Sequence, residues 1–104
     1  MTADKVPGCS QKIVRTARLI SGKWTLLILH CLTQDRQRFS ILQKLLGISP
    51  RTLSSRLSQL EEAGVLLRER YSEIPPRVEY SLTEKGKGLI PIVEAMRDYA
   101  EKWM

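Results

Sequence analysis

A short stretch of the sequence combines hydroxyl side chains with arginines and contains no acid. Between Ser49 and Ser58 five residues are Ser or Thr and two are Arg, and the next acid is Glu61. Serine and threonine offer hydrogen bonds without bulk, and an arginine can bond the O6 and N7 atoms of guanine in the major groove. Carboxylates in the same place would be repelled by phosphate. The stretch therefore has the chemistry of a surface that meets DNA.

The same stretch has the apolar spacing of a helix. Ser49 is a hydroxyl cap and Pro50 suits the first helical position, while Leu53, Leu57 and Leu60 recur on one side. Hydroxyl-rich exposed faces also occur on helices that bind nothing, so this feature alone leaves both interpretations open. On the opposite face and beside it, we expect DNA contacts from Arg51, Thr52, Ser54, Ser55, Ser58 and Gln59.

A shorter helix is predicted just before this one. Ser40 and Gln43 match the capping-box spacing, so a helix over residues 41–46 should end at Gly47. Two helices joined by a glycine turn, over about residues 40–63, have the arrangement of a helix-turn-helix.

The backbone phosphates of DNA need contacts of their own. Arg38 and Ser40 precede the first helix, and Ser49 and Thr52 lie where the unpaired N–H groups of the second helix favour anions. Arg56 lies nearer the apolar stripe, and it either holds a phosphate or pairs with an acid. We therefore place all five residues among the candidate DNA contacts.

A β-ribbon is predicted to follow the two helices. Residues 65–71 and 77–82 are expected to be strands, because the second alternates apolar and polar side chains. Pro75 and Pro76 between them make a stiff turn. The chain should therefore carry a protruding wing over about residues 65–82.

The wing contains three arginines. Arg77 is expected near its tip, where an arginine enters the minor groove or holds a phosphate. Arg68 and Arg70 either support it or pair across the strands with Glu69 or Glu79. For Arg77 such pairing is the less expected alternative.

Three further helices complete the predicted architecture. Residues 10–20 are amphipathic, residues 23–32 are apolar nearly all round and should form the centre of the core, and residues 83–103 form a C-terminal helix weakened by glycines and a proline. The apolar ladder of this last helix either packs on the chain's own core or forms a dimer. We expect dimerisation through Leu89, Ile92, Val93, Met96, Tyr99 and Trp103.

Composition fits one domain over residues 1–104 with a polyanionic partner. The net charge is +6, and from Lys5 to Leu60 ten bases face one acid, whereas from Glu61 onward seven bases face nine acids. No apolar run approaches the roughly 20 residues of a membrane span, and Met1 to Pro7 lack the apolar region of a signal peptide. We expect a cytoplasmic protein without a membrane partner.

Several motifs across the chain resemble the HxlR family, relatives of the MarR-type regulators. The residues that carry the resemblance are Cys9, SGKWTLLIL from Ser21, RFS from Arg38, GISPRTLSSRLSQLEEAG from Gly47 and IPPRVEYSLTEKG from Ile74. The resemblance implies a mainly α, α+β fold: a winged helix-turn-helix that binds double-stranded DNA and pairs about a two-fold axis through its terminal helices. Some members of the family sense oxidants through a cysteine matching Cys9.

Cysteine chemistry offers a switch at Cys9. This thiol precedes a predicted helix N-terminus with Lys12 and Arg15 nearby, and both features lower a thiol pKa and favour thiolate. The alternative is an unreactive cysteine. Cys31 is expected in the core, and His30 has no companions at metal-ligand spacing. We find no nucleophile with a base and no phosphate loop, so we expect no enzyme, metal or cofactor.

Two functions follow from these features. The first is a dimeric, sequence-specific transcription regulator, expected to be a repressor, whose half-sites one helical turn apart give a pseudo-palindrome of roughly 20 base pairs. The second is a winged-helix module for protein or RNA contacts without specific DNA readout. The sequence leaves any small-molecule effector unspecified.

Overall fold

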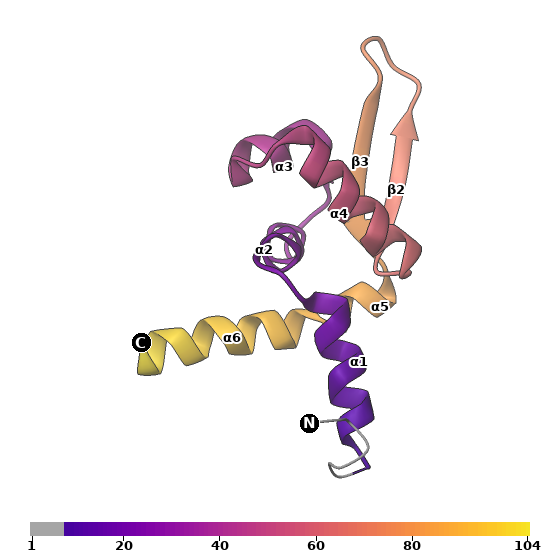
Figure 1. Cartoon of the computed structure of the whole chain (residues 1–104). Helices are drawn as coiled ribbons and strands as arrows, with labels where there is room; N and C mark the ends of the chain where they lie inside the picture. The colour runs from indigo at the N-terminus through magenta and orange to yellow at the C-terminus, as the bar shows by residue number, and fades with distance from the viewer. Residues whose placement is uncertain (1–7) are drawn as a thin grey trace.

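The computed structural model describes residues 8–104 as six helices and three strands (Figure 1). Two helices, α1 and α6, extend away from the body in different directions, and the β2–β3 ribbon projects from the opposite end (Figure 1). The elements are α1 (Ser10–Ile20), α2 (Lys23–Cys31), β1 (Gln37–Arg38), α3 (Phe39–Leu46), α4 (Pro50–Glu62), β2 (Leu66–Tyr71), β3 (Arg77–Leu82), α5 (Glu84–Lys87) and α6 (Ile90–Trp103).

The wing is part of a three-stranded antiparallel sheet. Strand β3 is central, with β2 on one side and the two-residue β1 on the other. The β2–β3 ribbon was predicted from alternation and is confirmed, whereas β1 was not predicted. Its pairing of Gln37 with Tyr80 and Arg38 with Glu79 is a tertiary contact that two residues of local sequence cannot signal.

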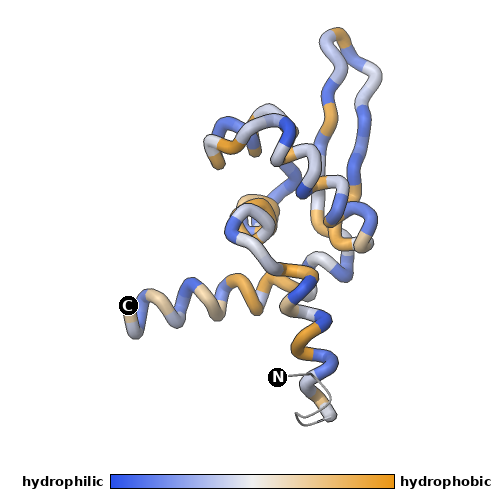
Figure 2. The backbone as a smooth tube through the Cα atoms, viewed as in Figure 1, coloured by the Kyte–Doolittle hydropathy of each residue, from blue (hydrophilic) through white to orange (hydrophobic). Residues whose placement is uncertain are grey.

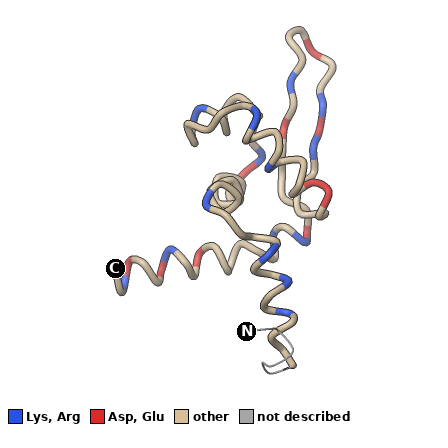
Figure 3. Tube along the Cα trace, in the orientation of Figure 1, with Lys and Arg blue, Asp and Glu red and all other residues tan. Residues whose placement is uncertain are grey.

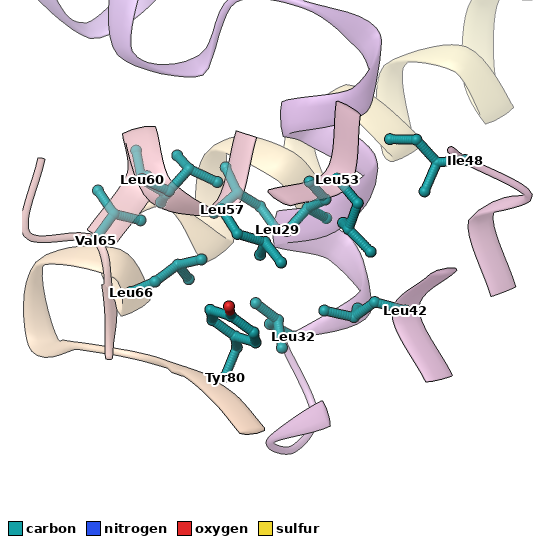
Figure 4. Close-up of a cluster of buried hydrophobic side chains, with 12 residues drawn as sticks. Leu29, Leu32, Leu42, Ile48, Leu53, Leu57, Leu60, Val65, Leu66 and Tyr80 are labelled. Carbon is teal, nitrogen blue, oxygen red and sulfur yellow. The ribbon is translucent and has the colours of Figure 1, made fainter. Parts of the chain in front are cut away.

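The core lies where α2, α3 and α4 meet the base of the sheet (Figure 4). Leu53, Leu57 and Leu60 of α4 are all buried, which confirms the predicted inward stripe. They pack with Leu29 of α2 and with Tyr80 of β3 (Figure 4). The opposite face of α4 is thereby directed away from the core.

Helix α2 is central but not buried all round. Ile28 and Leu29 are almost fully buried, whereas Leu27 is 38% exposed and His30 is exposed. Seen end-on, α2 is mostly apolar (Figure 2). One of its sides is left uncovered by the chain, while Ile28 and Leu29 confirm the prediction that this segment forms the centre of the core.

Helix α3 begins earlier than the capping-box pattern predicted. Its first residue is Phe39 and its cap is Arg38, whose side chain makes no capping hydrogen bond. Because Arg38 is held extended in β1, the chain turns into the helix directly from the strand, and Ser40 is already helical. The predicted Ser40 cap was therefore wrong. The predicted end was right, since Gly47 closes α3 with φ of +62°, a conformation that glycine adopts without strain.

The predicted C-terminal helix is divided into α5 and α6. Helix α5 ends at Lys87, and Pro91 lies in the first turn of α6, where its missing N–H costs nothing. A Cβ atom on Gly86 would meet the backbone carbonyl of Val65, so this glycine lets α5 approach the chain closely just before β2. Among residues 8–104, no helix combines the length and apolarity needed to cross a membrane.

Candidate nucleic-acid interface

The start of α4 is fixed by a side-chain cap. The Ser49 Oγ accepts a hydrogen bond from the Thr52 backbone N–H at 3.2 Å and lies 2.9 Å from Thr52 Oγ1, to which it donates. Pro50 follows at the first helical position. Both features were predicted from the sequence, and together they set where the exposed face of α4 begins.

That exposed face has the residues expected of it. Arg51, Ser54, Ser55, Ser58 and Gln59 are all exposed. Their side chains are short except at the two ends, so the helix axis can approach another surface closely over its middle turn. No carboxylate lies on this face of α4 before Glu61. The geometry suits entry into a major groove.

Two further predicted contacts, Thr52 and Arg56, are half-buried at the side of α4. Arg56 Nη1 donates a hydrogen bond to Gln59 Oε1 at 3.3 Å. Within residues 8–104 no carboxylate lies within ion-pair distance of Arg56. Of the two alternatives the sequence left open for this residue, pairing with an acid is therefore wrong, and phosphate contact stays a prediction.

A groove of about 590 Å³ separates α4 from the wing. It gathers residues that the sequence predicted separately: Arg38 and Ser40 from the start of α3, and Ser54 and Ser58 from α4. Lys and Arg lie on the helix-turn-helix and on both wing strands, where acids also occur, and in α6 they alternate with acids (Figure 3). The complete lining is Arg38, Phe39, Ser40, Ser54, Ser58, Glu61, Arg68, Pro76, Arg77, Val78 and Tyr80.

Arg77 is paired, contrary to expectation. Its Nη2 lies 3.1 Å from Glu73 Oε1, its Nε lies 3.0 Å from Glu79 Oε2, and its guanidinium stacks 4.4 Å from the Tyr71 ring centroid. The pairing is along β3 and into the turn, because the residues that face Glu79 and Arg77 across the strands are Glu69 and Tyr71. A sequence read one residue at a time does not reveal this arrangement.

The other two wing arginines show the reverse pattern. Arg68 and Arg70 are exposed and make no ion pair with any residue of the described part of the chain. The register explains why, since Arg68 faces Tyr80 and Arg70 faces Val78 across the strands. The predicted alternative of cross-strand pairing with Glu69 or Glu79 was wrong for both. Arg68 lines the groove, a role that the sequence assigned only as support for Arg77.

The two cysteines lie away from this groove and in different surroundings. Cys9 is exposed and occupies the cap position of α1, where its carbonyl accepts the Lys12 N–H at 3.1 Å. Cys31 is half-buried at the end of α2, and burial raises the pKa of its thiol. Both thiols are free.

The six predicted dimerisation residues divide into two sets. Leu89 is buried and Ile92 and Val93 pack against the chain's own core, so this half of the ladder follows the alternative in which it packs on the monomer. Met96 is 49% exposed, Tyr99 62% and Trp103 66%. Only the outer half of the ladder is free to meet another molecule.

The order of helix, turn, helix and β-ribbon, with a hydroxyl- and arginine-bearing second helix beside a basic groove, defines a winged helix-turn-helix DNA-binding protein. The profile of the HxlR-like helix-turn-helix family matches residues 19–104. The chain belongs to this family, and it is a helix-turn-helix transcriptional regulator rather than an enzyme.

Known proteins resemble the chain over most of its length. YdeP, an HTH-type transcriptional regulator of Bacillus subtilis strain 168, is 40% identical over 103 residues, which is 98% of this chain and 79% of the relative. The solved structure of the redox regulator HypR in its reduced form has a TM-score of 0.83 and 36% identity over 88% of this chain and 91% of that one. A MarR-family regulator structure from Porphyromonas gingivalis W83 has a TM-score of 0.85 and 30% identity, covering 100% of this chain and 98% of that one.

Proposed function

We propose that the protein is a homodimeric repressor that reads a pseudo-palindromic operator with α4 in the major groove. The observation that carries the proposal is the exposed face of α4, which bears hydroxyls and Arg51 without a carboxylate and opens onto the basic groove beside the wing. Two copies related by a two-fold axis present two such helices, so half-sites about one helical turn apart fit them.

Direct readout is tested at Arg51. Duplexes are first selected from a random library by the wild-type protein at stated salt, and the affinity of Arg51→Ala is then measured on the selected duplex. Loss of a bidentate guanine contact costs about 1–3 kcal/mol and relaxes the preference at that base. Arg97→Ala is the matched control, because Arg97 is an exposed arginine on α6 that pairs with Asp98. Equal affinities for both variants would reject the proposed orientation of α4.

The second copy is proposed to dock on the outer face of α6. Met96, Tyr99 and Ala100 form one apolar hollow there with Pro91 and Ile92. An exposed tyrosine and tryptophan on one short helix are the residue types that carry most binding energy in protein interfaces. Helix α6 lies at the far side of the molecule from the wing (Figure 1), so a dimer formed on this helix leaves α4 free.

A redox response through Cys9 is proposed as the signal. The thiol is exposed, it makes no capping hydrogen bond, and it lies at the N-terminal cap of α1, outside the DNA-facing groove. Oxidation there would act on the arrangement of the two copies and so on the spacing of their α4 helices. The supporting comparison is the likeness to HypR, which is named as a redox regulator.

The redox proposal is tested with matched serine variants. Operator affinity is measured with and without a mild thiol oxidant for the wild type, Cys9→Ser and Cys31→Ser. We expect the oxidant effect to be absent only in Cys9→Ser, because Cys31 is half-buried. An effect that persists in Cys9→Ser would remove this residue from the mechanism.

A further inference from the structure

The two faces of the wing differ in charge. Successive side chains of a strand point to opposite faces, and the register places Arg68 with Tyr80 and Arg70 with Val78 on one of them. No carboxylate is present among these four residues. Tyr80 is buried in the core, so this face is the one turned toward α4.

The other face carries acids that oppose one another. Glu69 and Glu79 are direct cross-strand partners, an arrangement of like charges that destabilises a sheet unless cations intervene. Arg77 meets Glu79 from the turn side, as described above. Arg36, in the loop before β1, approaches from the other side, with its Nη1 3.8 Å from Glu79 Oε1.

Arg36 also joins the loop to β2 through a tyrosine. Its Nη1 donates to Tyr71 Oη at 3.0 Å, and Tyr71 Oη in turn donates to Glu69 Oε2 at 3.3 Å. Tyr71 is the same ring on which Arg77 stacks. The two arginines, Tyr71 and the three glutamates Glu69, Glu73 and Glu79 therefore form one network, which we call the wing anchor.

The charges of the wing anchor indicate whether Arg77 belongs to that network or contacts DNA. The wing anchor has two arginines and three glutamates, so its formal charge is −1, and Glu79 is only 14% exposed. Freeing the Arg77 guanidinium for a phosphate would leave Glu79 and Glu69 facing each other with Arg36 alone. The cost of leaving two facing, largely buried carboxylates with a single arginine opposes any gain from the phosphate.

We infer that Arg68 is the wing residue that contacts the DNA backbone, and that Arg77 is a positioning residue that holds the wing at the angle Arg68 needs. Arg68 is exposed, free of ion pairs within residues 8–104, and lines the same groove as Ser54 and Ser58 of α4. The inference rests on the proposed function, since it takes the groove between α4 and the wing as the path of a DNA strand.

A double-mutant cycle separates contact from positioning. Affinity for a random-sequence duplex of about 30 base pairs, three helical turns, is measured over a range of salt for the wild type, Arg68→Ala, Arg77→Ala and the double variant. Loss of one phosphate contact lowers the salt slope by about 0.9 per bound subunit, which is about fivefold in affinity at 0.15 M salt. Because Arg77 acts through Arg68, Arg77→Ala should weaken binding alone but add nothing to Arg68→Ala.

Additive losses in the double variant, or an unchanged salt slope in Arg68→Ala, would overturn the inference. Conservative variants give a second reading: Arg68→Lys keeps a charge at the phosphate and should restore the slope, whereas Arg77→Lys cannot bridge two carboxylates and stack on Tyr71, and should not. Rescue by Arg77→Lys would mark Arg77 as a direct contact.

Arg70→Ala is the matched control, because Arg70 shares the strand and face of Arg68 but does not line the groove. It should keep the wild-type slope, and a loss here as large as that of Arg68→Ala would reject the assignment of Arg68. The random-sequence duplex makes this test independent of the Arg51→Ala measurement on the selected duplex. If Arg68→Ala keeps the wild-type salt slope while Arg51→Ala loses affinity, the assignment of Arg68 fails. If Arg68→Ala lowers the slope while Arg51→Ala keeps its affinity, the proposed orientation of α4 fails.

Discussion

Helices α4 and α6 both leave one face uncovered, and the two faces have opposite chemistry. The face of α4 carries hydroxyls, Arg51 and Gln59, while all three of its inward leucines are buried. The outer face of α6 carries Met96, Tyr99 and Trp103, each about half exposed or more. Helix α4 thus buries all of its leucines in the core of the chain, whereas helix α6 leaves part of its apolar residues exposed.

The difference indicates what each face meets. A polar, acid-free surface is stable in water without a partner and suits a ligand that is bound and released, such as DNA. An apolar surface with exposed aromatic residues is typical of a protein interface. On the proposed function, α4 therefore meets a temporary partner, DNA, and α6 a lasting one, a second copy of the chain.

The largest effect is expected on the buried side of α4, which packs on the chain's own core. Leu57 is 1% exposed at the centre of the core, so Leu57→Ala should lower the free energy of unfolding by about 2–5 kcal/mol. Chemical denaturation at several protein concentrations measures it. Ser58→Ala, one residue along on the exposed face, is the control. A loss below that range would mean that the inward stripe is not tightly packed.

The next effect tests the lasting partner of α6. Tyr99→Ala should weaken self-association by about 2 kcal/mol, roughly 30-fold in the dimer dissociation constant, because aromatic residues at interfaces are frequent hot spots. Analytical ultracentrifugation measures the change. Glu101→Ala, at another exposed position of α6 that does not line the apolar hollow, should keep the wild-type constant. If both variants associate like the wild type, the outer face of α6 is not the dimer surface.

A smaller effect is expected on the polar face of α4. It has opposite signs for folding stability and for operator binding. Alanine is a better helix former than serine by about 0.5 kcal/mol, so Ser55→Ala should raise the free energy of unfolding by a few tenths of a kcal/mol. The same change removes a hydrogen bond to DNA worth about 0.5–1.5 kcal/mol and should weaken operator binding. Thermal unfolding and binding titrations are measured on the same sample. A variant that becomes more stable without losing affinity would show that Ser55 does not face the groove.

Local signals predicted the helix-turn-helix because they act within a few residues. The Ser49 cap, the proline after it and the glycine at position 47 each specify a helix end through their own backbone and side-chain chemistry. The leucine stripe of α4 then specified the buried side. These features needed no knowledge of the rest of the chain.

The features that could not be predicted depend on contacts distant in sequence. Strand β1 exists because Arg38 pairs with Glu79, and that pairing moved the start of α3 away from the Ser40 cap. Arg36 joins the wing anchor across 35 positions of the chain. The sequence also could not predict which apolar residues of α6 pack on the core and which stay exposed. Spacing alone cannot distinguish Val93, which packs on the core, from Met96, which does not.

The smallest expected effect concerns the inner side of α6, where Cys31 lines a hollow between α2 and that helix. Burial raises the pKa of this thiol above its ordinary value of 9.0. Above pH 9.0 the unfolded chain therefore loses a proton that the folded chain retains, so the free energy of unfolding falls as pH rises from 9.0 toward the folded pKa. Well below pH 9.0 both states keep the proton and the contribution is complete. Urea unfolding between about pH 8 and pH 10 should show a steeper decline of the free energy of unfolding with pH for the wild type than for Cys31→Ala, which lacks the titrating group.

Cys9→Ala is the control, since Cys9 is exposed at the start of α1. Equal slopes for the wild type and Cys31→Ala would mean that the hollow admits water to the thiol, and the inner side of α6 would then be less firmly packed than its contacts with α2 indicate.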